Sequence, residues 1–144
     1  MKKISVLFVC LGNICRSPAA EAIFIRLLEK KGLTDGFIVD SAGTGSWHIG
    51  KKADSRMRIA AERRDINILS RARQITSKDF EEFNYIIAMD DSNFRNIQDL
   101  KNRTASTNFA SIKKYKILNQ LLMSKKFLTL ILEVMRVSIM SLIF

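Results

Sequence analysis

Along the first hundred positions, segments with the apolar pattern of a strand alternate with segments that have the apolar spacing of a helix. Ile4–Cys10 is a continuous, β-branched apolar run, which is typical of a central parallel strand buried on both faces. A short loop containing glycine follows, and the apolar spacing then becomes that of a helix ending near Gly32. We expect the Ser17 hydroxyl to cap this helix and Pro18 to begin it. The first unit is therefore a strand, a tight loop and a helix.

The same alternation continues to about residue 101. Four more segments predict two strands, a helix and a short helical turn: Phe37–Ser41 and Tyr85–Met89 as strands, 54–64 as the helix and 79–83 as the turn. Asp90, Asp91 and Ser92 offer caps for a last helix that runs to about Lys101. Strands that alternate with helices form a parallel sheet covered on both faces. We therefore expect a three-layer α/β domain with a four-stranded parallel sheet.

Length and composition agree with one compact domain. The chain has 144 residues, of which 47% are hydrophobic and 26% charged, and such values are typical of a single globular domain. Its two cysteines are too few for the disulfide framework of a small secreted protein. Met1-Lys2-Lys3 leads into an apolar run that is too short for a signal peptide. These features predict a cytoplasmic protein.

The net charge of +10 suggests an anionic partner, although surplus solubilising lysine and arginine would give the same value. A basic run between residues 56 and 73 lacks the interleaved aromatic residues of a nucleic-acid reader, which favours a solvated face. Segment 127–144 is long enough to approach a membrane span, but Glu133 and Arg136 lie in its middle. We therefore expect no nucleic-acid and no membrane partner, and a phosphorylated substrate is the anion that fits best.

The loop between the first strand and the first helix carries the candidate chemistry. It has the sequence Cys10-Leu-Gly-Asn-Ile-Cys-Arg16-Ser, a C-x5-R pattern. Gly12 and Asn13 tolerate the unusual backbone angles of a loop whose N–H groups point inward at an anion. A helix N-terminus and an arginine add positive charge there, so Cys10 would be stabilised as a thiolate. Cys10 is therefore a candidate nucleophile aimed at phosphorus.

This stretch closely resembles the low-molecular-weight protein tyrosine phosphatase family. The family signature, VCLGNICRSPxAE, is present from Val9 to Glu21. Shorter similar segments are DSAGT at 40–44, WHIG at 47–50, RARQ at 71–74 and AMDDSN at 88–93. The resemblance covers residue 4 to about residue 113. It implies a flavodoxin-like phosphatase fold that hydrolyses phosphotyrosine or another phosphomonoester without metal or cofactor.

The resemblance also assigns roles to particular residues. Cys10 would form a phosphocysteine intermediate, and Arg16 would bind the phosphoryl oxygens. The other loop residues would surround the substrate phosphate: Leu11, Gly12, Asn13, Ile14, Cys15 and Ser17. Trp47 and His48 would form the rim of the site.

Three polar residues and a second cysteine would support the nucleophile. By the resemblance, Asn13, Ser17 and Ser41 hold the loop and favour the thiolate. Cys15 would protect the nucleophile by forming a reversible disulfide with it. None of these assignments includes a metal ligand.

The resemblance ends near residue 113. The family normally continues with an Asp-Pro-Tyr loop whose aspartate is the general acid, but Pro18 is the one proline of this sequence and no general acid is found. The codons for Lys125 through Arg136, shifted by one reading frame, permit E-V-P-D-P-Y-F-G-G-D-E. We therefore hypothesise a frameshift near Lys113–Lys116, which divides the chain into a phosphatase-like domain (1–113) and an aberrant, atypical tail (114–144).

Two other functions fit the same loop. A phosphate-binding pseudoenzyme would keep the cradle without the general acid, and a turnover assay separates it from a catalyst. An arsenate reductase on the same fold would need further redox cysteines, and none follows Cys15. The sequence does not distinguish a phosphotyrosine protein from a phosphosugar or phosphoarginine substrate, and it leaves the oligomeric state open.

Overall fold

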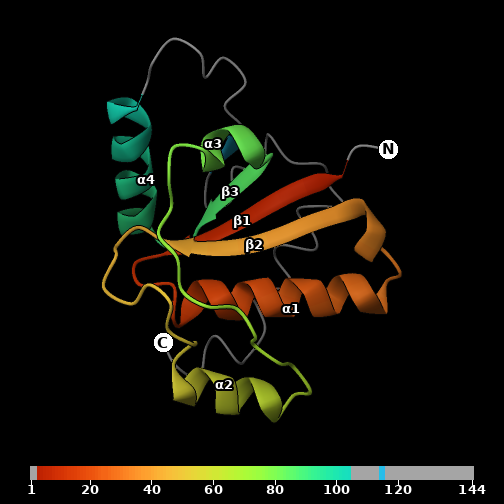
Figure 1. The fold of residues 1–144 in the computed structure, drawn as a ribbon. Coiled ribbons are helices and arrows are strands. Elements are labelled where there is room, and N and C mark those ends of the chain that lie inside the picture. Colours follow the sequence, from red (N-terminus) through yellow and green to blue (C-terminus); the bar gives the residue numbers. More distant parts are fainter. Residues whose placement is uncertain (1–2, 105–113, 116–144) are drawn as a thin grey trace.

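The computed structural model of the chain describes residues 3–104 and 114–115. Strands and helices alternate, as the apolar spacing predicted. In chain order the elements are β1 (Ile4–Cys10), α1 (Arg16–Lys30), a 3-10 turn η1 (Thr34–Gly36), β2 (Phe37–Gly43), α2 (Ser55–Glu62), α3 (Asp79–Glu82), β3 (Tyr85–Ala88), α4 (Asp91–Arg103) and β4 (Lys114–Tyr115). Figure 1 shows how the helices flank the strands.

The strands form a parallel sheet in the order β2-β1-β3-β4. β1 pairs with β2 along its whole length, from Ile4 opposite Phe37 to Cys10 opposite Gly43. Three of the strands have four residues or more, and the two-residue β4 pairs with the start of β3. Because all strands are parallel, β1, β2 and β3 end at the same edge of the sheet (Figure 1). Loops that follow these strands therefore meet there.

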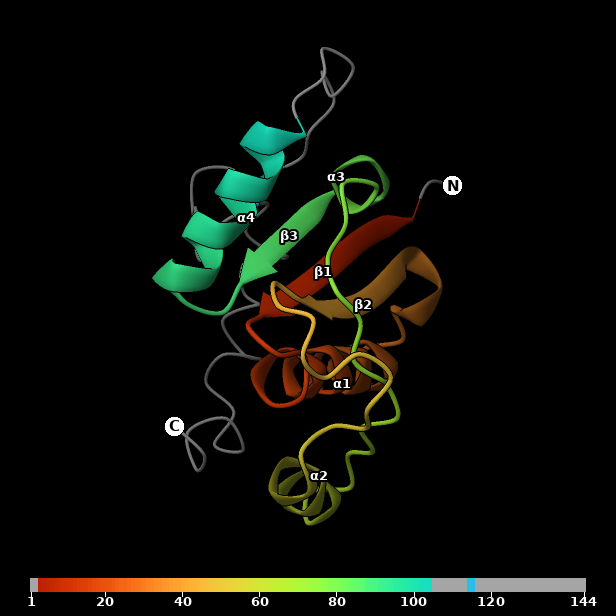
Figure 2. The same ribbon diagram turned by 60° about the vertical axis from the view of Figure 1, so that its left-hand side comes forward.

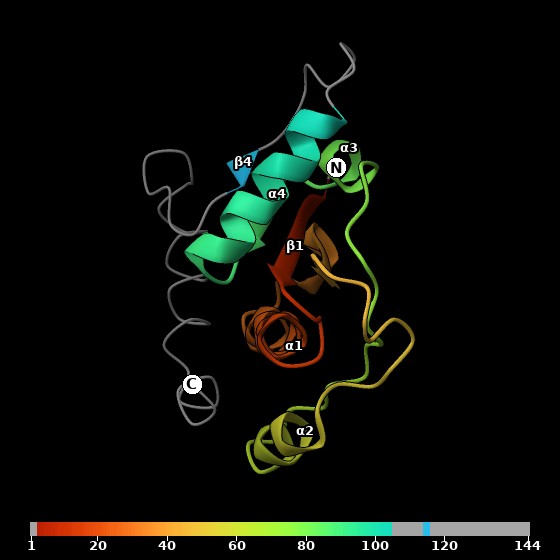
Figure 3. The same ribbon diagram turned by 90° about the vertical axis from the view of Figure 1, so that its left-hand side faces the viewer.

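β1 is the centre of two hydrophobic cores, one on each face of the sheet. Val6 and Phe8 pack with the apolar side of α1, and Phe8 meets Phe24 edge to face at 5.7 Å between ring centroids. Leu7 and Val9 point the other way and pack with residues of α3 and α4. Figure 3 shows α1 and α4 on opposite sides of β1. The prediction of a strand buried on both faces is confirmed.

The N-terminus of α1 differs from the prediction. The helix begins at Arg16, Cys15 is the N-cap residue, and no side chain caps it. Ser17 therefore lies inside the first turn, and its hydroxyl is 3.0 Å from Cys10 Sγ instead of bonding to its own helix. The predicted cap is wrong because a tertiary partner binds the hydroxyl. The C-terminus is as expected, since the chain leaves the helix through Gly32 at φ +67°.

α2 and α4 begin at aspartate caps. Asp54 accepts a hydrogen bond from the Arg56 backbone N–H, and Asp90 accepts one from the Asn93 backbone N–H at 2.7 Å. α2 lies beyond α1 as seen from the sheet (Figure 2) and buries Met57 in the same core. The α4 cap was predicted correctly. It also places Asp90 at the carboxyl edge of the sheet.

The predicted aberrant tail lies almost entirely outside the described residues. The exception is β4. Within residues 3–104 and 114–115, no helix combines the length and hydropathy needed to cross a membrane.

Candidate functional site

The C-x5-R loop lies where β1 ends and α1 begins. It is surrounded by the end of β2, the segment after it, and the N-terminus of α4 (Figures 1 and 3). The first turn of a 15-residue helix points at the loop, and unpaired N–H groups give such a helix end a partial positive charge. The fold therefore places the predicted anion site at the edge where the strand ends converge.

The backbone of the loop is held from outside through its carbonyl groups. Three of them accept hydrogen bonds from neighbouring backbone N–H groups: Cys10 from Thr44 at 2.9 Å, Leu11 from Gly45 at 2.8 Å and Ile14 from Asp54 at 2.7 Å. In a trans peptide the C=O of one residue and the N–H of the next point in opposite directions. The N–H groups that follow these carbonyls therefore point away from those partners, and the Asn13 N–H donates to Cys10 Sγ inside the loop.

Asn13 is the centre of the loop's polar contacts. It is 2% exposed and has a φ of +56°, a left-handed conformation that asparagine tolerates better than most residues. Its side-chain amide donates to Ser17 Oγ at 2.8 Å and to Ser41 Oγ at 3.0 Å. Its side-chain oxygen accepts from the Arg73 backbone N–H at 3.0 Å. Its own N–H donates to Cys10 Sγ at 3.2 Å.

These contacts place two polar groups beside the sulfur. The Asn13 side-chain amide donates to Ser17 Oγ, which lies 3.0 Å from Cys10 Sγ and 3.4 Å from the Ala42 carbonyl oxygen. Cys10 is 3% exposed, so the Asn13 N–H and the Ser17 hydroxyl meet its sulfur in a buried setting.

The second cysteine has different surroundings. Cys15 is half-buried, and burial together with the nearby charges of Asp54 and Cys10 raises the pKa of its thiol. Both cysteines are free. A smaller fraction of the Cys15 thiol is therefore ionised at neutral pH than in an ordinary cysteine.

Arg16 is paired with the cap of α4. Its guanidinium Nη1 lies 2.6 Å from Asp90 Oδ2. Burial opposes ionisation of Asp90, but hydrogen bonds from the Asn93 backbone and from Arg16 outweigh it and lower the pKa of this carboxyl. The pair connects the loop to the opposite face of the sheet and orients the guanidinium. Sequence analysis gave Asp90 as a cap and as part of the family-like segment 88–93, but did not pair it with Arg16, because nothing in the local sequence connects residues 74 positions apart.

At two positions of the site a glycine is needed because a Cβ would come too close to a neighbouring atom, and not because of the backbone angles. A Cβ on Gly12 would lie 2.9 Å from His48 Cδ2, and a Cβ on Gly43 would lie 2.8 Å from the Leu11 carbonyl oxygen. Of the two residues that we expected to need unusual backbone angles, Asn13 has a positive φ and Gly12 does not. Gly12 instead leaves room for His48.

The remaining predicted residues divide between framework and surface. Ser41 is buried, accepts from Asn13 and donates to Glu21 Oε1. Leu11 and Trp47 are exposed, at 47% and 67%. The structure thus brings His48 against the loop, whereas the Trp47 ring lies against Gly45 with most of its surface exposed.

Sequence analysis missed Arg73 and Glu21 as parts of this framework. Arg73 was assigned to a solvated basic face, but its guanidinium pairs with Asp40 and Asp79 at 3.0 Å each. Its backbone N–H also holds Asn13. The RARQ segment that resembles the family contained this signal, but the charge pattern alone pointed to solvent.

Comparisons with known proteins agree with this geometry. The sequence model of the low molecular weight phosphotyrosine protein phosphatase family matches residues 5–120. The low molecular weight phosphotyrosine protein phosphatase of Schizosaccharomyces pombe is 50% identical over 101 residues, which are 69% of this chain and 65% of that protein. The chain thus matches slightly less than two thirds of this relative.

Solved structures of similar fold cover nearly the whole chain. A protein tyrosine phosphatase from Entamoeba histolytica is 34% identical, with a TM-score of 0.70 over 98% of this chain and 95% of that one. YfkJ from Bacillus subtilis is 35% identical, with a TM-score of 0.75 over 99% of this chain and 94% of that one. The fold is therefore the flavodoxin-like α/β fold of these phosphatases. On the match of sequence and structure, the chain belongs to the low molecular weight phosphotyrosine protein phosphatase family.

Proposed function

We propose that this protein hydrolyses phosphomonoesters of the phosphotyrosine type through a phosphocysteine intermediate on Cys10. The observation that carries the proposal is the Cys10 sulfur, buried at the carboxyl end of β1 and hydrogen-bonded to Asn13 N–H and Ser17 Oγ. The membership of this chain in a phosphatase family supports the same reaction. The cytoplasmic location stays a prediction.

The reaction has two steps. The Cys10 thiolate attacks phosphorus, an S–P bond forms, and the P–O bond to the tyrosyl oxygen breaks. Arg16 and the inward N–H groups stabilise the charge on the transferring phosphoryl oxygens. Water then attacks phosphorus, inorganic phosphate leaves, and the thiolate is regenerated. The loop residues from Leu11 to Ser17 surround the phosphate in both steps.

We propose that the first step is impaired in the chain as printed. A departing phenolate needs a proton, and the printed sequence has no Asp-Pro-Tyr loop to supply it. Asp90 is the carboxyl beside Arg16, but its lowered pKa keeps it ionised at neutral pH, so it has no proton to give. The frameshift hypothesis explains the loss, since the other reading frame permits the missing loop in a segment that lies outside the described residues.

The test compares the printed chain with a chain whose reading frame is restored after Lys114. We expect both chains to hydrolyse nitrophenyl phosphate, because its acidic phenol leaves unprotonated. On phosphotyrosine peptides, we expect the restored chain to be faster by the factor of about 10²–10⁴ typical of general acid catalysis. Equal rates on the peptides would show that the missing loop does not supply the acid.

Cys10→Ser in both chains is the control for contaminating phosphatases. A specific observation also favours a phosphate-binding pseudoenzyme: hydrogen bonds hold the C-x5-R loop through Asn13, whereas the lowered pKa of Asp90 leaves this carboxyl, beside Arg16, without a proton to donate. That function predicts phosphate binding by the printed chain, no turnover of nitrophenyl phosphate, and no burst of nitrophenol. A stoichiometric burst would exclude it.

A further inference from the structure

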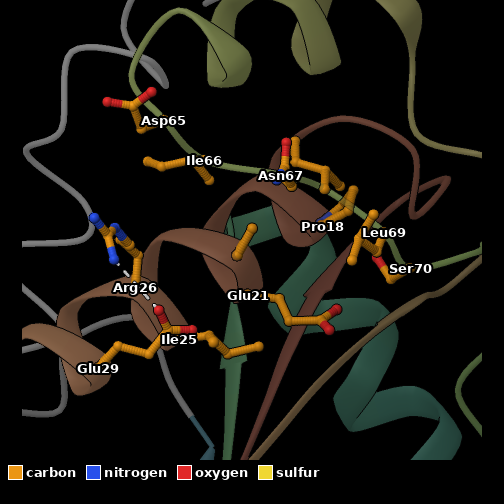
Figure 4. A pocket seen from close by; sticks show the side chains of 12 residues that line it. Pro18, Glu21, Ile25, Arg26, Glu29, Asp65, Ile66, Asn67, Leu69 and Ser70 are labelled. Atoms are coloured by element: carbon orange, nitrogen blue, oxygen red, sulfur yellow. Dashed lines mark hydrogen bonds and ion pairs between the residues drawn. The ribbon is translucent and has the colours of Figure 1, made fainter. Parts of the chain in front are cut away.

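A cavity of about 460 Å³ lies behind the loop, between α1 and residues 65–70. Figure 4 shows its lining residues. Half of the lining residues are apolar, namely Pro18, Ala22, Ile25, Ile66, Ile68 and Leu69. The lining also has three carboxyl groups, those of Glu21, Glu29 and Asp65, and one guanidinium, that of Arg26. The cavity therefore combines apolar wall segments with a net negative lining.

Glu21 is the one of these carboxyls that is substantially buried. Burial raises its pKa to about 7, against the opposing effect of a hydrogen bond from Ser41. Asp40 on β2 raises this pKa further, while Ser70 and Arg73 lower it. Arg73 is itself paired with Asp40 and Asp79. The charge of Glu21 is therefore incompletely compensated by the groups that face it.

The other charged groups of the cavity lie at its exposed side. Arg26 pairs with Glu29 at 3.4 Å, and both side chains are about half exposed, at 42% and 50%. Figure 4 shows this pair apart from the Glu21 carboxylate, which extends towards Ser70. Arg26 is thus engaged with Glu29 rather than with Glu21.

We propose that this cavity is a binding site for a small organic cation with an apolar body, and that Glu21 is the group that pairs with the cationic nitrogen. A buried carboxylate gains most from a counter-charge that enters the same low-dielectric space. The apolar walls would cover the hydrocarbon part of the ligand. A neutral ligand of the same shape gains only the second contribution, and an anion would be repelled.

The site is separate from the C-x5-R loop, residues 10–17, but a chain of hydrogen bonds connects the two. Glu21 accepts from Ser41, whose oxygen accepts from the Asn13 amide, and Asn13 donates to Ser17 beside Cys10. An occupant of the cavity would therefore touch the outer end of the network that holds the nucleophile.

Binding of benzylamine, compared with benzyl alcohol, tests the proposal on the full chain. The two molecules have nearly the same shape, but benzylamine is a cation at neutral pH. We expect saturable binding of benzylamine with amide NMR shifts at residues 66–70, and binding of the alcohol at least about tenfold weaker, as a lost ion pair in a partly buried site requires. Between pH 8 and pH 6 the affinity for benzylamine should fall by about tenfold, because Glu21 takes up a proton.

Glu21→Gln and Glu29→Gln form a matched pair of variants. Both remove one negative charge from the cavity lining, but only the first removes the carboxylate bonded to Ser41. We expect Glu21→Gln to abolish both the preference for the cation and its dependence on pH, and Glu29→Gln to keep both. Should Glu21→Gln not fold, the pH dependence in the unmodified chain still decides.

Three results would overturn the proposal. The first is equal affinity for the amine and the alcohol. The second is an equal loss of benzylamine affinity in the two variants, and the third is a set of NMR shifts centred on residues 10–17 instead of 66–70.

Discussion

The C-x5-R loop, residues 10–17, and the rim segment beside it, residues 44–50, differ in how far their side chains are buried. In the loop, Cys10 and Asn13 are 3% and 2% exposed, and the Asn13 side chain makes three hydrogen bonds. In the rim, Trp47 and Ile49 are 67% and 57% exposed, although the backbone of Thr44 and Gly45 donates to the loop. The atoms that would make and break bonds are fixed by buried polar contacts. The surface that would meet the rest of the substrate is formed by solvent-exposed side chains.

This contrast predicts that substitutions in the loop change the chemistry and substitutions in the rim change recognition. The largest expected effect is that of Cys10→Ser. Loss of the nucleophile should reduce turnover of nitrophenyl phosphate by about 10⁴-fold or more, while phosphate binding measured by calorimetry is retained. Cys15→Ser is the matched control, and it should keep turnover within about threefold of the unmodified chain, since no bond to phosphorus involves it.

Oxidation should abolish nearly all of the phosphatase activity, and the loss should be reversible. We expect peroxide to close a disulfide between Cys10 and Cys15, because both lie in one short loop and the first has the more reactive thiolate. Activity should return with a thiol reductant, and peptide mass spectrometry should identify the bond. Irreversible sulfonic acid at Cys10, with Cys15 still reduced, would show that the second cysteine gives no protection.

Two substitutions of Asn13 distinguish the contribution of its side-chain hydrogen bonds to stability from that of its left-handed backbone. Asn13→Ala loses three buried hydrogen bonds and places a Cβ-bearing residue without a compensating amide at φ +56°. Its free energy of unfolding should fall by about 2–4 kcal/mol. Asn13→Gly loses the same bonds without the strain, so it should be more stable than the alanine variant by about 1 kcal/mol.

Urea unfolding of both variants measures the difference. If Asn13→Gly were no more stable than Asn13→Ala, the left-handed backbone would not be a constraint on the loop. Iodoacetamide labelling of Cys10 should slow in both variants, since the Asn13 amide no longer holds Ser17 Oγ beside the sulfur.

Glu21→Gln should stabilise the protein at high pH. The folded state holds the Glu21 proton up to a pKa of about 7, whereas the unfolded state releases it near the ordinary value of 4.5. The contribution of this proton to stability is complete at low pH and is lost as pH rises from about 4.5 to 7. Glutamine avoids this loss, so we expect a gain of about 1–2 kcal/mol at pH 8, allowing for partial exposure, and little change at pH 4.

Urea unfolding at the two pH values measures this effect, with Glu29→Gln as the exposed control. A gain that is the same at pH 4 and pH 8 would mean that the Glu21 proton is not its cause.

The smallest effect is expected in the rim. Trp47→Ala should change the free energy of unfolding by no more than about 0.5 kcal/mol, because the side chain is mostly solvated. It should raise KM for aryl phosphates a fewfold and leave kcat for nitrophenyl phosphate unchanged. Steady-state kinetics check this split, and a large loss of kcat would show that the rim and the loop act as one unit.

The sequence by itself determined the elements and the chemistry that depend on neighbouring residues. A continuous apolar run identified β1, helical spacing identified α1 and α2, and the caps from Asp90 to Ser92 identified α4. The C-x5-R pattern placed a thiol, an arginine and a helix N-terminus within one loop. These features could be predicted because their physical causes, side-chain alternation, capping and the helix dipole, act over a few residues.

Only the tertiary structure decided how that loop is held. Arg16 meets Asp90, Asn13 meets Arg73, and Ser17 bonds to Cys10 rather than to its own helix. The same is true of Glu21, an ordinary surface position in a helical pattern until β2 and residues 66–70 close over it. The order of strands in the sheet decides which of these residues meet. Burial then removes water from their polar groups, so that they bond to one another. Local propensity contains no information about either.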